Sequence, residues 1–242
     1  MSAYRPLAFL ILAATFVMSS GHATAGGRIG TGFFIRDDGV LLTNRHVVEG
    51  CRTLTVVPVD GRRYPARSLA ISSTYDLAAI RVDRYKPISI LPLRAYGRNV
   101  SVPDEGEEVM TGGFSDPERA GERISIVDGI VVDKVIASNR LPFDTIMLSA
   151  IRSGASGSPV VDIGGAFVGV IHSATAEFDR QLPGQFSRFD VGAKFHNNNA
   201  VSDFLTREGI QFHFREAGAR MLPRLQLVGL VNNSTVLIEC TL

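Results

Sequence analysis

Three short segments of the chain carry side chains that could together hydrolyse an amide or ester bond. They present an imidazole at His46, a carboxylate at Asp76 and a hydroxyl at Ser156, which stands between Gly154 and Gly157. An imidazole titrates near neutral pH and suits a general base, and a carboxylate can fix its tautomer. A turn bracketed by glycines can gather backbone N–H groups around an oxyanion, and a hydroxyl beside it can attack a carbonyl.

Each of the three residues, taken alone, has a simpler interpretation. A single histidine is more often packed or exposed than catalytic, and an aspartate before an apolar run, such as Asp76, often caps the end of a strand. The Gly/Ser segment around Ser156 is equally compatible with an ordinary turn between strands. The order histidine, aspartate, serine in one chain is what favours the catalytic interpretation.

The composition limits the kinds of protein that can hold these residues. Of 242 residues, 45% are hydrophobic and 20% are charged, which is a globular balance that argues against disorder. The 25 Lys and Arg residues nearly cancel the 24 Asp and Glu residues, so no basic excess exists to bind nucleic acid.

The chain alternates short β-rich runs with turn residues, which predicts an all-β sandwich or barrel. We predict strands at 31–35, 40–43, 53–59, 77–82, 108–111, 125–132, 145–148, 160–163 and 166–171. A helix is predicted over 199–208, with Asn199 as its cap, and a terminal hairpin over 225–241 around 232–234. The polar stretch 92–106 is interpreted as a linker between two β units.

The combined motifs resemble those of the chymotrypsin/trypsin-like serine peptidases, especially the bacterial branch with HtrA/Deg peptidases and glutamyl endopeptidases. The resemblance covers residues 30–205. It rests on the motifs 30–35 (GTGFFI), 42–48 (LTNRHVV), 76–82 (DLAAIRV), 154–159 (GASGSP), 168–172 (VGVIH) and 191–193 (VGA).

The resemblance implies two Greek-key six-stranded β-barrels, the first at about 28–95 and the second at about 106–208, with an extension over 209–242. It implies a serine endopeptidase that forms an acyl-enzyme through His46, Asp76 and Ser156, with the N–H groups of Gly154 and Ser156 as the oxyanion hole. The expected partner is a polypeptide substrate, and no cofactor is expected. The alternative is a noncatalytic homologue that binds a peptide or protein partner.

Several features depart from the family pattern. Ala155 stands where the family usually has Asp or Asn, a side chain that normally helps to hold the oxyanion turn. This departure gives the noncatalytic alternative its support. The residues after Leu205 are too few for a PDZ domain, so we expect none.

The resemblance also places a substrate pocket. Its expected lining is Ala150 at the floor, with His172, Ser173, Ala174 and Ala193 along the walls. Since these segments hold no acidic residue, a small or apolar P1 side chain is expected rather than Arg or Lys. An acidic P1 is the alternative, because glutamyl endopeptidases use a histidine near position 172, although the spacing is one residue longer here.

Two cysteines and the three histidines after His46 are the candidates for disulfide and metal binding. Cys51 and Cys240 either form a disulfide that ties the C-terminus to the loop after His46 or remain buried thiols. His172, His196 and His213 are scattered along the sequence without metal-ligand spacing, so no metal site is expected.

The first 25 residues resemble a secretory signal peptide. Arg5 precedes an apolar run that ends before the small-x-small site Ala23–Ala25. The run is shorter than the ~20 residues of a membrane-spanning helix, so a retained anchor is the weaker alternative. We therefore expect cleavage to leave residues 26–242 as an exported peptidase domain without a membrane span, in the periplasm or outside the cell.

Overall fold

A computed structural model describes residues 27–97, 99–114, 123–134, 144–151, 154–175, 192–218 and 220–242. The predicted signal peptide lies outside these residues. Within the described ranges, no helix combines the length and the apolar character needed to cross a membrane.

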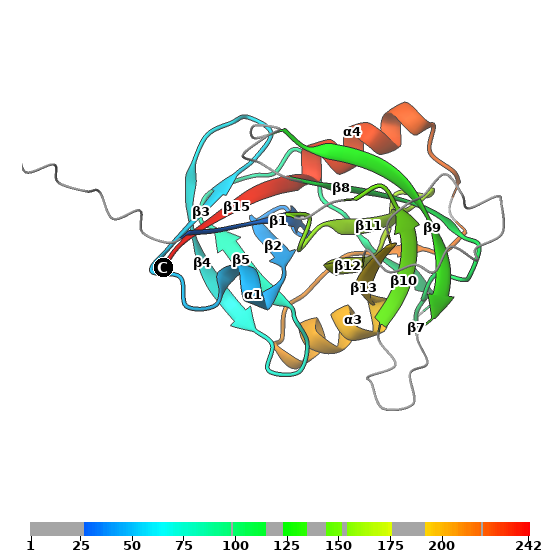
Figure 1. The fold of residues 1–242 in the computed structure, drawn as a ribbon, viewed down its shortest axis with the longest axis horizontal. Coiled ribbons are helices and arrows are strands. Elements are labelled where there is room, and N and C mark those ends of the chain that lie inside the picture. The colour runs from blue at the N-terminus through cyan, green and yellow to red at the C-terminus, as the bar shows by residue number, and fades with distance from the viewer. Residues whose placement is uncertain are drawn as a thin grey trace, which may run out of the picture.

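The first half of the chain supplies five strands of a closed six-stranded barrel (Figure 1). Around the barrel its strands are β1 (Gly27–Phe34), β15 (Thr235–Thr241), β3 (Thr53–Val57), β4 (Tyr64–Ile71), β5 (Ala78–Val82) and β2 (Val40–Thr43). The short helix α1 (Arg45–Val48) follows β2 directly. Apart from β15, the strands come from one continuous segment of sequence.

The C-terminal strand completes this first barrel. β15 pairs antiparallel with β1 on one side and with β3 on the other, so that Leu237 faces both Thr31 and Val57. Figure 1 shows this strand running between the two strands near the start of the chain. The domain boundaries expected from the sequence leave this strand outside the first barrel.

The predicted terminal hairpin is wrong, because its first half is a helix. Helix α4 (Arg224–Ser234) leads directly into β15. Leu227 and Val231, four residues apart, are buried on one side of the helix, and the Ser234 hydroxyl donates to the Leu230 carbonyl. The Asn-Asn-Ser segment that suggests a turn is therefore the last turn of this helix.

The second barrel is also closed and six-stranded, which confirms the predicted pair of barrels. Its strands form the ring β8 (Glu108–Gly113), β9 (Ser125–Lys134), β10 (Asp144–Ser149), β13 (Gly192–Asn197), β12 (Phe167–Thr175) and β11 (Pro159–Asp162). Helix α3 (Asn198–Arg207) follows β13. Its cap is Asn197, whose side chain accepts from the Asn199 N–H, two residues before the predicted cap.

The predicted linker contains ordered structure. It holds β6 (Leu93–Tyr96) and the short β7 (Asn99–Val100), which pair with each other. β6 also runs parallel to β14 (Phe214–Glu216) and meets β12. The segment between the barrels is therefore attached to the second one.

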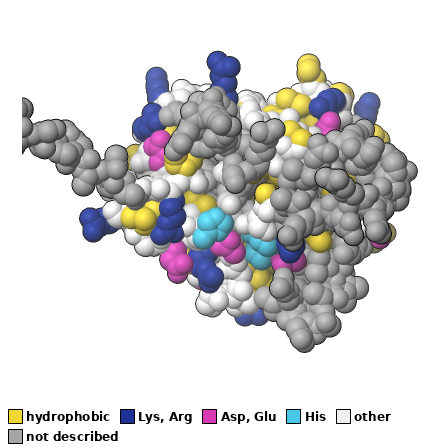
Figure 2. Space-filling model, viewed as in Figure 1, with side chains coloured by type: hydrophobic (Ala, Val, Ile, Leu, Met, Phe, Trp, Pro, Cys, Tyr) yellow, Lys and Arg dark blue, Asp and Glu magenta, His cyan; other side chains and the backbone are white. Residues whose placement is uncertain are grey.

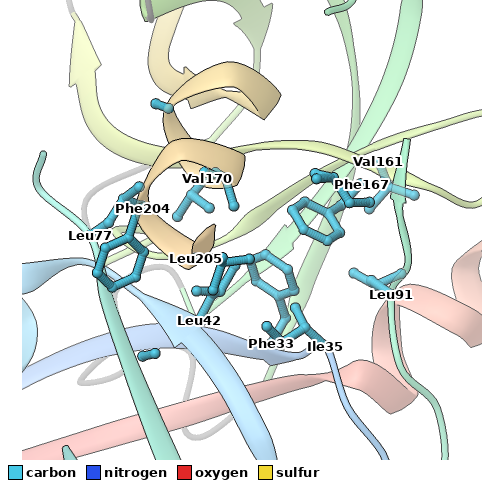
Figure 3. Close-up of a cluster of buried hydrophobic side chains, with 14 of the residues drawn as sticks. Phe33, Ile35, Leu42, Leu77, Leu91, Val161, Phe167, Val170, Phe204 and Leu205 are labelled. Carbon is cyan, nitrogen blue, oxygen red and sulfur yellow. The ribbon is translucent and has the colours of Figure 1, made fainter. Parts of the chain in front are cut away.

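Successive side chains along a strand point to opposite faces, so some fill the interior of a barrel and others fill the core between the two barrels. Phe34 packs inside the first barrel, whereas its neighbours Phe33 and Ile35 belong to the cluster that joins the two barrels. Phe33 meets Phe167 of β12 edge to face, with ring centroids 5.1 Å apart. Figure 3 shows this shared cluster beneath α3, with Phe33, Ile35, Leu42, Leu77, Leu91, Val161, Phe167, Val170, Phe204 and Leu205 labelled.

A disulfide joins Cys51, in the loop after α1, to Cys240 of β15. The two residues are 189 apart in sequence, so the bond closes most of residues 27–242 into one loop. Such a closure restricts the unfolded ensemble and typically stabilises a fold by about 2–5 kcal/mol.

We expect the double variant Cys51→Ala/Cys240→Ala to lose about 2–5 kcal/mol of unfolding free energy. The measurement is urea denaturation of both proteins, with and without reductant. The reductant should destabilise the wild type and leave the variant unchanged. Equal unfolding midpoints for oxidised and reduced wild type would show that the bond contributes nothing.

Candidate active site

His46 stands on a short helix whose other side is anchored in the first barrel. Val47 and Val48 are buried in the barrel interior, which leaves the His46 side chain 48% exposed. The preceding Asn44 is completely buried, and its side-chain amide donates to the Asp76 carbonyl at 2.7 Å. On the face shown in Figure 2, histidine side chains reach the surface next to acidic side chains.

Asp76 binds His46 through both oxygens of its carboxylate. One oxygen accepts from the His46 backbone N–H at 2.9 Å, and the other from the ring Nδ1 at 2.6 Å. Burial raises the pKa of the Asp76 carboxyl, but the hydrogen bonds and charge of His46 outweigh it and bring the pKa below its ordinary value. The carboxylate therefore holds the imidazole with a hydrogen on Nδ1 and leaves Nε2 free to accept a proton.

The turn that carries Ser156 lies against the first barrel. The Thr31 N–H of β1 donates to the Ser156 carbonyl at 2.8 Å, and the Gly157 N–H donates to the Ile171 carbonyl of β12 at 2.8 Å. Thr43, at the end of β2, donates its hydroxyl to the Thr31 carbonyl at 2.7 Å. The turn is thus fixed between the two barrels beside the end of β2, from which His46 follows.

A second cluster of polar side chains lies in the second barrel and contacts the Asp76 backbone. His172 of β12 and His196 of β13 stack with ring centroids 4.3 Å apart, and both face the Asp144 carboxylate of β10. The sequence-based view that these histidines are scattered is wrong, because β12 and β13 are neighbouring strands. Two imidazoles and a carboxylate are also groups that could hold a metal ion, with ligand atoms within 4.8 Å of one another.

A sequence model described as a trypsin-like peptidase domain matches residues 30–170, more than half of the chain. The chain belongs to the trypsin-like peptidase family. The matched range contains all three predicted triad residues, His46, Asp76 and Ser156. The resemblance inferred from the motifs is confirmed.

Named relatives extend the comparison with the HtrA/Deg branch. A probable periplasmic serine endoprotease DegP-like of Chlamydia trachomatis is 29% identical over 146 residues, covering 58% of this chain and 27% of that protein. The magnetosome formation protease MamE of Paramagnetospirillum magneticum is 33% identical over 146 residues, covering 59% of this chain and 19% of that protein. The chain thus spans less than a third of the length of either relative.

Solved structures share the fold of this trypsin-like peptidase domain. The active form of the Rv3671c protease from Mycobacterium tuberculosis aligns with a TM-score of 0.58 and 20% sequence identity. The alignment covers 76% of this chain and 75% of that one. At this identity the likeness shows the two-barrel fold.

The turn in which the resemblance places the oxyanion hole contains Ala155. Its methyl group is only 2% exposed and packs in the apolar interior of the second barrel with Val109, Val160 and Val168. Gly154, the preceding residue, has a φ of +95°, which suits glycine. The position that is usually polar in the family is therefore held by apolar packing.

The predicted pocket residues divide by burial. Ala150 and Ala174 are exposed and Ser173 is half-buried, whereas Ala193 is completely buried in the second barrel's interior cluster. His172 occupies a β-bulge, since the pairing of β12 with β13 shifts between Ile171 and Ser173. After the bulge the register is displaced by one residue, so that Ser173 pairs with Lys194.

Three residues that hold the site were not predicted from the sequence. Asn44 binds the Asp76 carbonyl, His196 accepts from the Asp76 N–H at 3.2 Å, and Asp144 binds His196 at 2.8 Å. The separation between Asp76 and His196 is 120 residues, so no local pattern connects them. Asn44 could have been found, because it lies within the histidine motif 42–48.

We expect Gly157→Ala to destabilise the site strongly. Gly157 has a φ of +88°, and a Cβ atom there would lie 1.9 Å from the Thr31 carbonyl oxygen. The backbone strain and the overlap together should cost roughly 2–5 kcal/mol. Gly61→Ala is the matched control, because its φ is +71° but a Cβ would meet nothing within 4 Å. Chemical denaturation should show a much smaller loss for Gly61→Ala, and equal losses would contradict the tight seating of the turn.

Proposed function

We propose that the chain is an exported serine endopeptidase that cleaves peptide bonds through an acyl-enzyme. The observation that carries this proposal is the double hydrogen bonding of His46 by the Asp76 carboxylate. Support also comes from the Ser156 turn, which lies against the same barrel beside the end of β2. Membership of the trypsin-like peptidase family agrees with this chemistry.

The proposed reaction has two halves. The Ser156 hydroxyl attacks the carbonyl carbon of the substrate while His46 Nε2 takes the hydroxyl proton, and the N–H groups of Gly154 and Ser156 stabilise the oxyanion. The C–N bond then breaks, and His46 gives its proton to the leaving amine. Water attacks the resulting ester by the same route, and its proton passes through His46 back to Ser156 as the acid product leaves.

Export is supported by one feature of the sequence, by the description of one relative and by one feature of the structure. The first 25 residues have the pattern of a signal peptide, and the DegP-like relative is described as periplasmic. The disulfide between Cys51 and Cys240 suits an oxidising compartment. We therefore place the mature chain in the periplasm or outside the cell.

The proposed P1 preference is for small or apolar side chains. His172, the residue that suggested an acidic preference, has its side chain only 16% exposed and its Nε2 3.4 Å from an Asp144 oxygen. The Asp144 carboxylate already interacts with the His172 imidazole and offsets any positive charge on the ring. The ring therefore attracts a substrate carboxylate only weakly.

Cleavage profiling of a peptide library with residues 26–242 tests activity and preference together. We expect cuts after small or apolar residues. Enrichment of Arg or Lys at P1 would contradict the proposed pocket. A folded protein that cuts no peptide and does not react with a fluorophosphonate would support the noncatalytic alternative.

A further inference from the structure

We propose that His196 is a positioning residue for the triad, which holds Asp76 from the second barrel while Asp144 holds His196. This inference rests on the proposed peptidase function. It assigns a role to a histidine and a carboxylate that take no part in the chemistry itself.

Every polar group of Asp76 is engaged by a different neighbour. The carboxylate accepts two hydrogen bonds from His46, and the carbonyl accepts one from Asn44. Both residues lie in the segment that follows β2 in the first barrel. The remaining group, the Asp76 N–H, donates to Nε2 of His196 on β13 at 3.2 Å. His196 therefore ties the first-barrel half of the site to the barrel that carries Ser156.

The hydrogen bond from Asp76 determines the tautomer of His196. Nε2 can accept the Asp76 N–H only through a lone pair, so the ring hydrogen must sit on Nδ1. Nδ1 lies 2.8 Å from an Asp144 oxygen, and the two residues face each other across β10 and β13. Burial raises the pKa of the Asp144 carboxyl, but its interactions with His172 and His196 bring the pKa well below the ordinary value. An ionised Asp144 can only accept, which selects the tautomer that Asp76 requires.

Packing fixes the orientation of the ring. His196 is 8% exposed, with His172 stacked on it and the Tyr75 ring at 6.0 Å in an edge arrangement. The Tyr75 hydroxyl donates to Asp203 of α3 at 2.9 Å, which anchors the residue directly before Asp76. The ring is thus held by contacts as well as by its two hydrogen bonds.

The same tautomer argues against a metal ion bound through His196 Nδ1. Ligation there would use the Nδ1 lone pair and place the hydrogen on Nε2, facing the Asp76 N–H. A metal ion bound to His196 Nδ1 and the hydrogen bond from Asp76 to His196 Nε2 therefore exclude each other. The triad geometry favours the hydrogen bond.

The test compares two replacements of His196 in the mature chain. His196→Phe keeps a planar ring but has no acceptor for the Asp76 N–H, and we expect kcat to fall by about 10²-fold with little change in KM. His196→Gln places an amide oxygen within reach of that N–H and should restore most of kcat. His213→Phe, at an exposed histidine, is the matched control and should leave both constants unchanged.

The tautomer can be measured directly in the wild-type protein, whether or not the variants fold. Imidazole ¹⁵N shifts should show neutral His196 protonated at Nδ1. Protonation at Nε2 would overturn the proposal, as would stoichiometric Zn²⁺ binding that shifts the His196 signals.

The remaining outcomes separate this inference from the proposed function. A wild type that neither cleaves peptides nor labels with a fluorophosphonate contradicts the peptidase function. An active wild type with an equally active His196→Phe contradicts only the positioning role. Equal impairment of the Phe and Gln variants also contradicts it, because the acceptor would then not be the cause.

Discussion

Replacement of Ser156 by alanine should lower kcat for a cleaved peptide by about 10⁶-fold and leave the fold intact. The side-chain oxygen is the proposed nucleophile, so its loss removes the acyl-enzyme route altogether. The turn itself should survive, because the Ser156 carbonyl, not the side chain, accepts the bond from Thr31. Peptide hydrolysis measured beside urea denaturation tests both halves of the prediction.

Ser158→Ala is the matched control for this variant. Ser158 lies two residues further along, is completely buried, and its hydroxyl has no hydrogen-bond partner among the described residues. We expect Ser158→Ala to keep its activity. Substantial activity in Ser156→Ala would place the nucleophile elsewhere.

Replacement of Asp76 by asparagine should lower kcat by about 10⁴-fold with a small effect on KM. The amide oxygen can still accept from the His46 backbone, but the amide nitrogen would then face His46 Nδ1, which accepts only when its hydrogen has moved to Nε2. That tautomer cannot take the proton from Ser156. Steady-state kinetics on the peptide found by profiling provides the measurement.

Asp83→Asn is the control for the loss of one carboxylate. Asp83 is 60% exposed and pairs with Arg67 and Arg81 on the surface, where such pairs contribute little. It should behave like the wild type. An Asp76→Asn variant with a kcat within a few-fold of Asp83→Asn would show that Asp76 does not set the state of His46.

The sequence predicts the strands that carry strong apolar runs. Val40–Thr43 is found at its predicted bounds, because all four residues are buried. No strand is predicted over Tyr64–Ile71, since it contains a proline and all of its residues are exposed or half-buried. An exposed barrel strand forms because it pairs with the neighbouring strands. The local pattern of apolar and polar residues does not reveal that pairing.

Contacts between distant parts of the chain set the limit of prediction. The apolar run that becomes β15 is visible, but its place between β1 and β3 depends on pairing across about 200 residues. The helix before it is missed because Leu227 and Val231 are too few to outweigh the turn residues that follow. The preference for a hairpin thus came from local turn chemistry that the helix overrides.

The residues of the candidate site also fall into those that the sequence predicts and those that depend on contacts between distant segments. His46, Asp76 and Ser156 are found because each lies in a motif with its own local signature. The support from His196 and Asp144 depends on neighbouring strands in the second barrel and has no such signature. The bulge at His172 likewise becomes visible only when the pairing partners of β12 are known.

Mass spectrometry of the wild-type mature chain after reaction with a fluorophosphonate tests the central claim most directly. We predict one covalent adduct per chain, on the peptide that contains Ser156, and its loss in Ser156→Ala. A folded protein that remains unlabelled, or an adduct on another residue that persists in Ser156→Ala, would contradict the account.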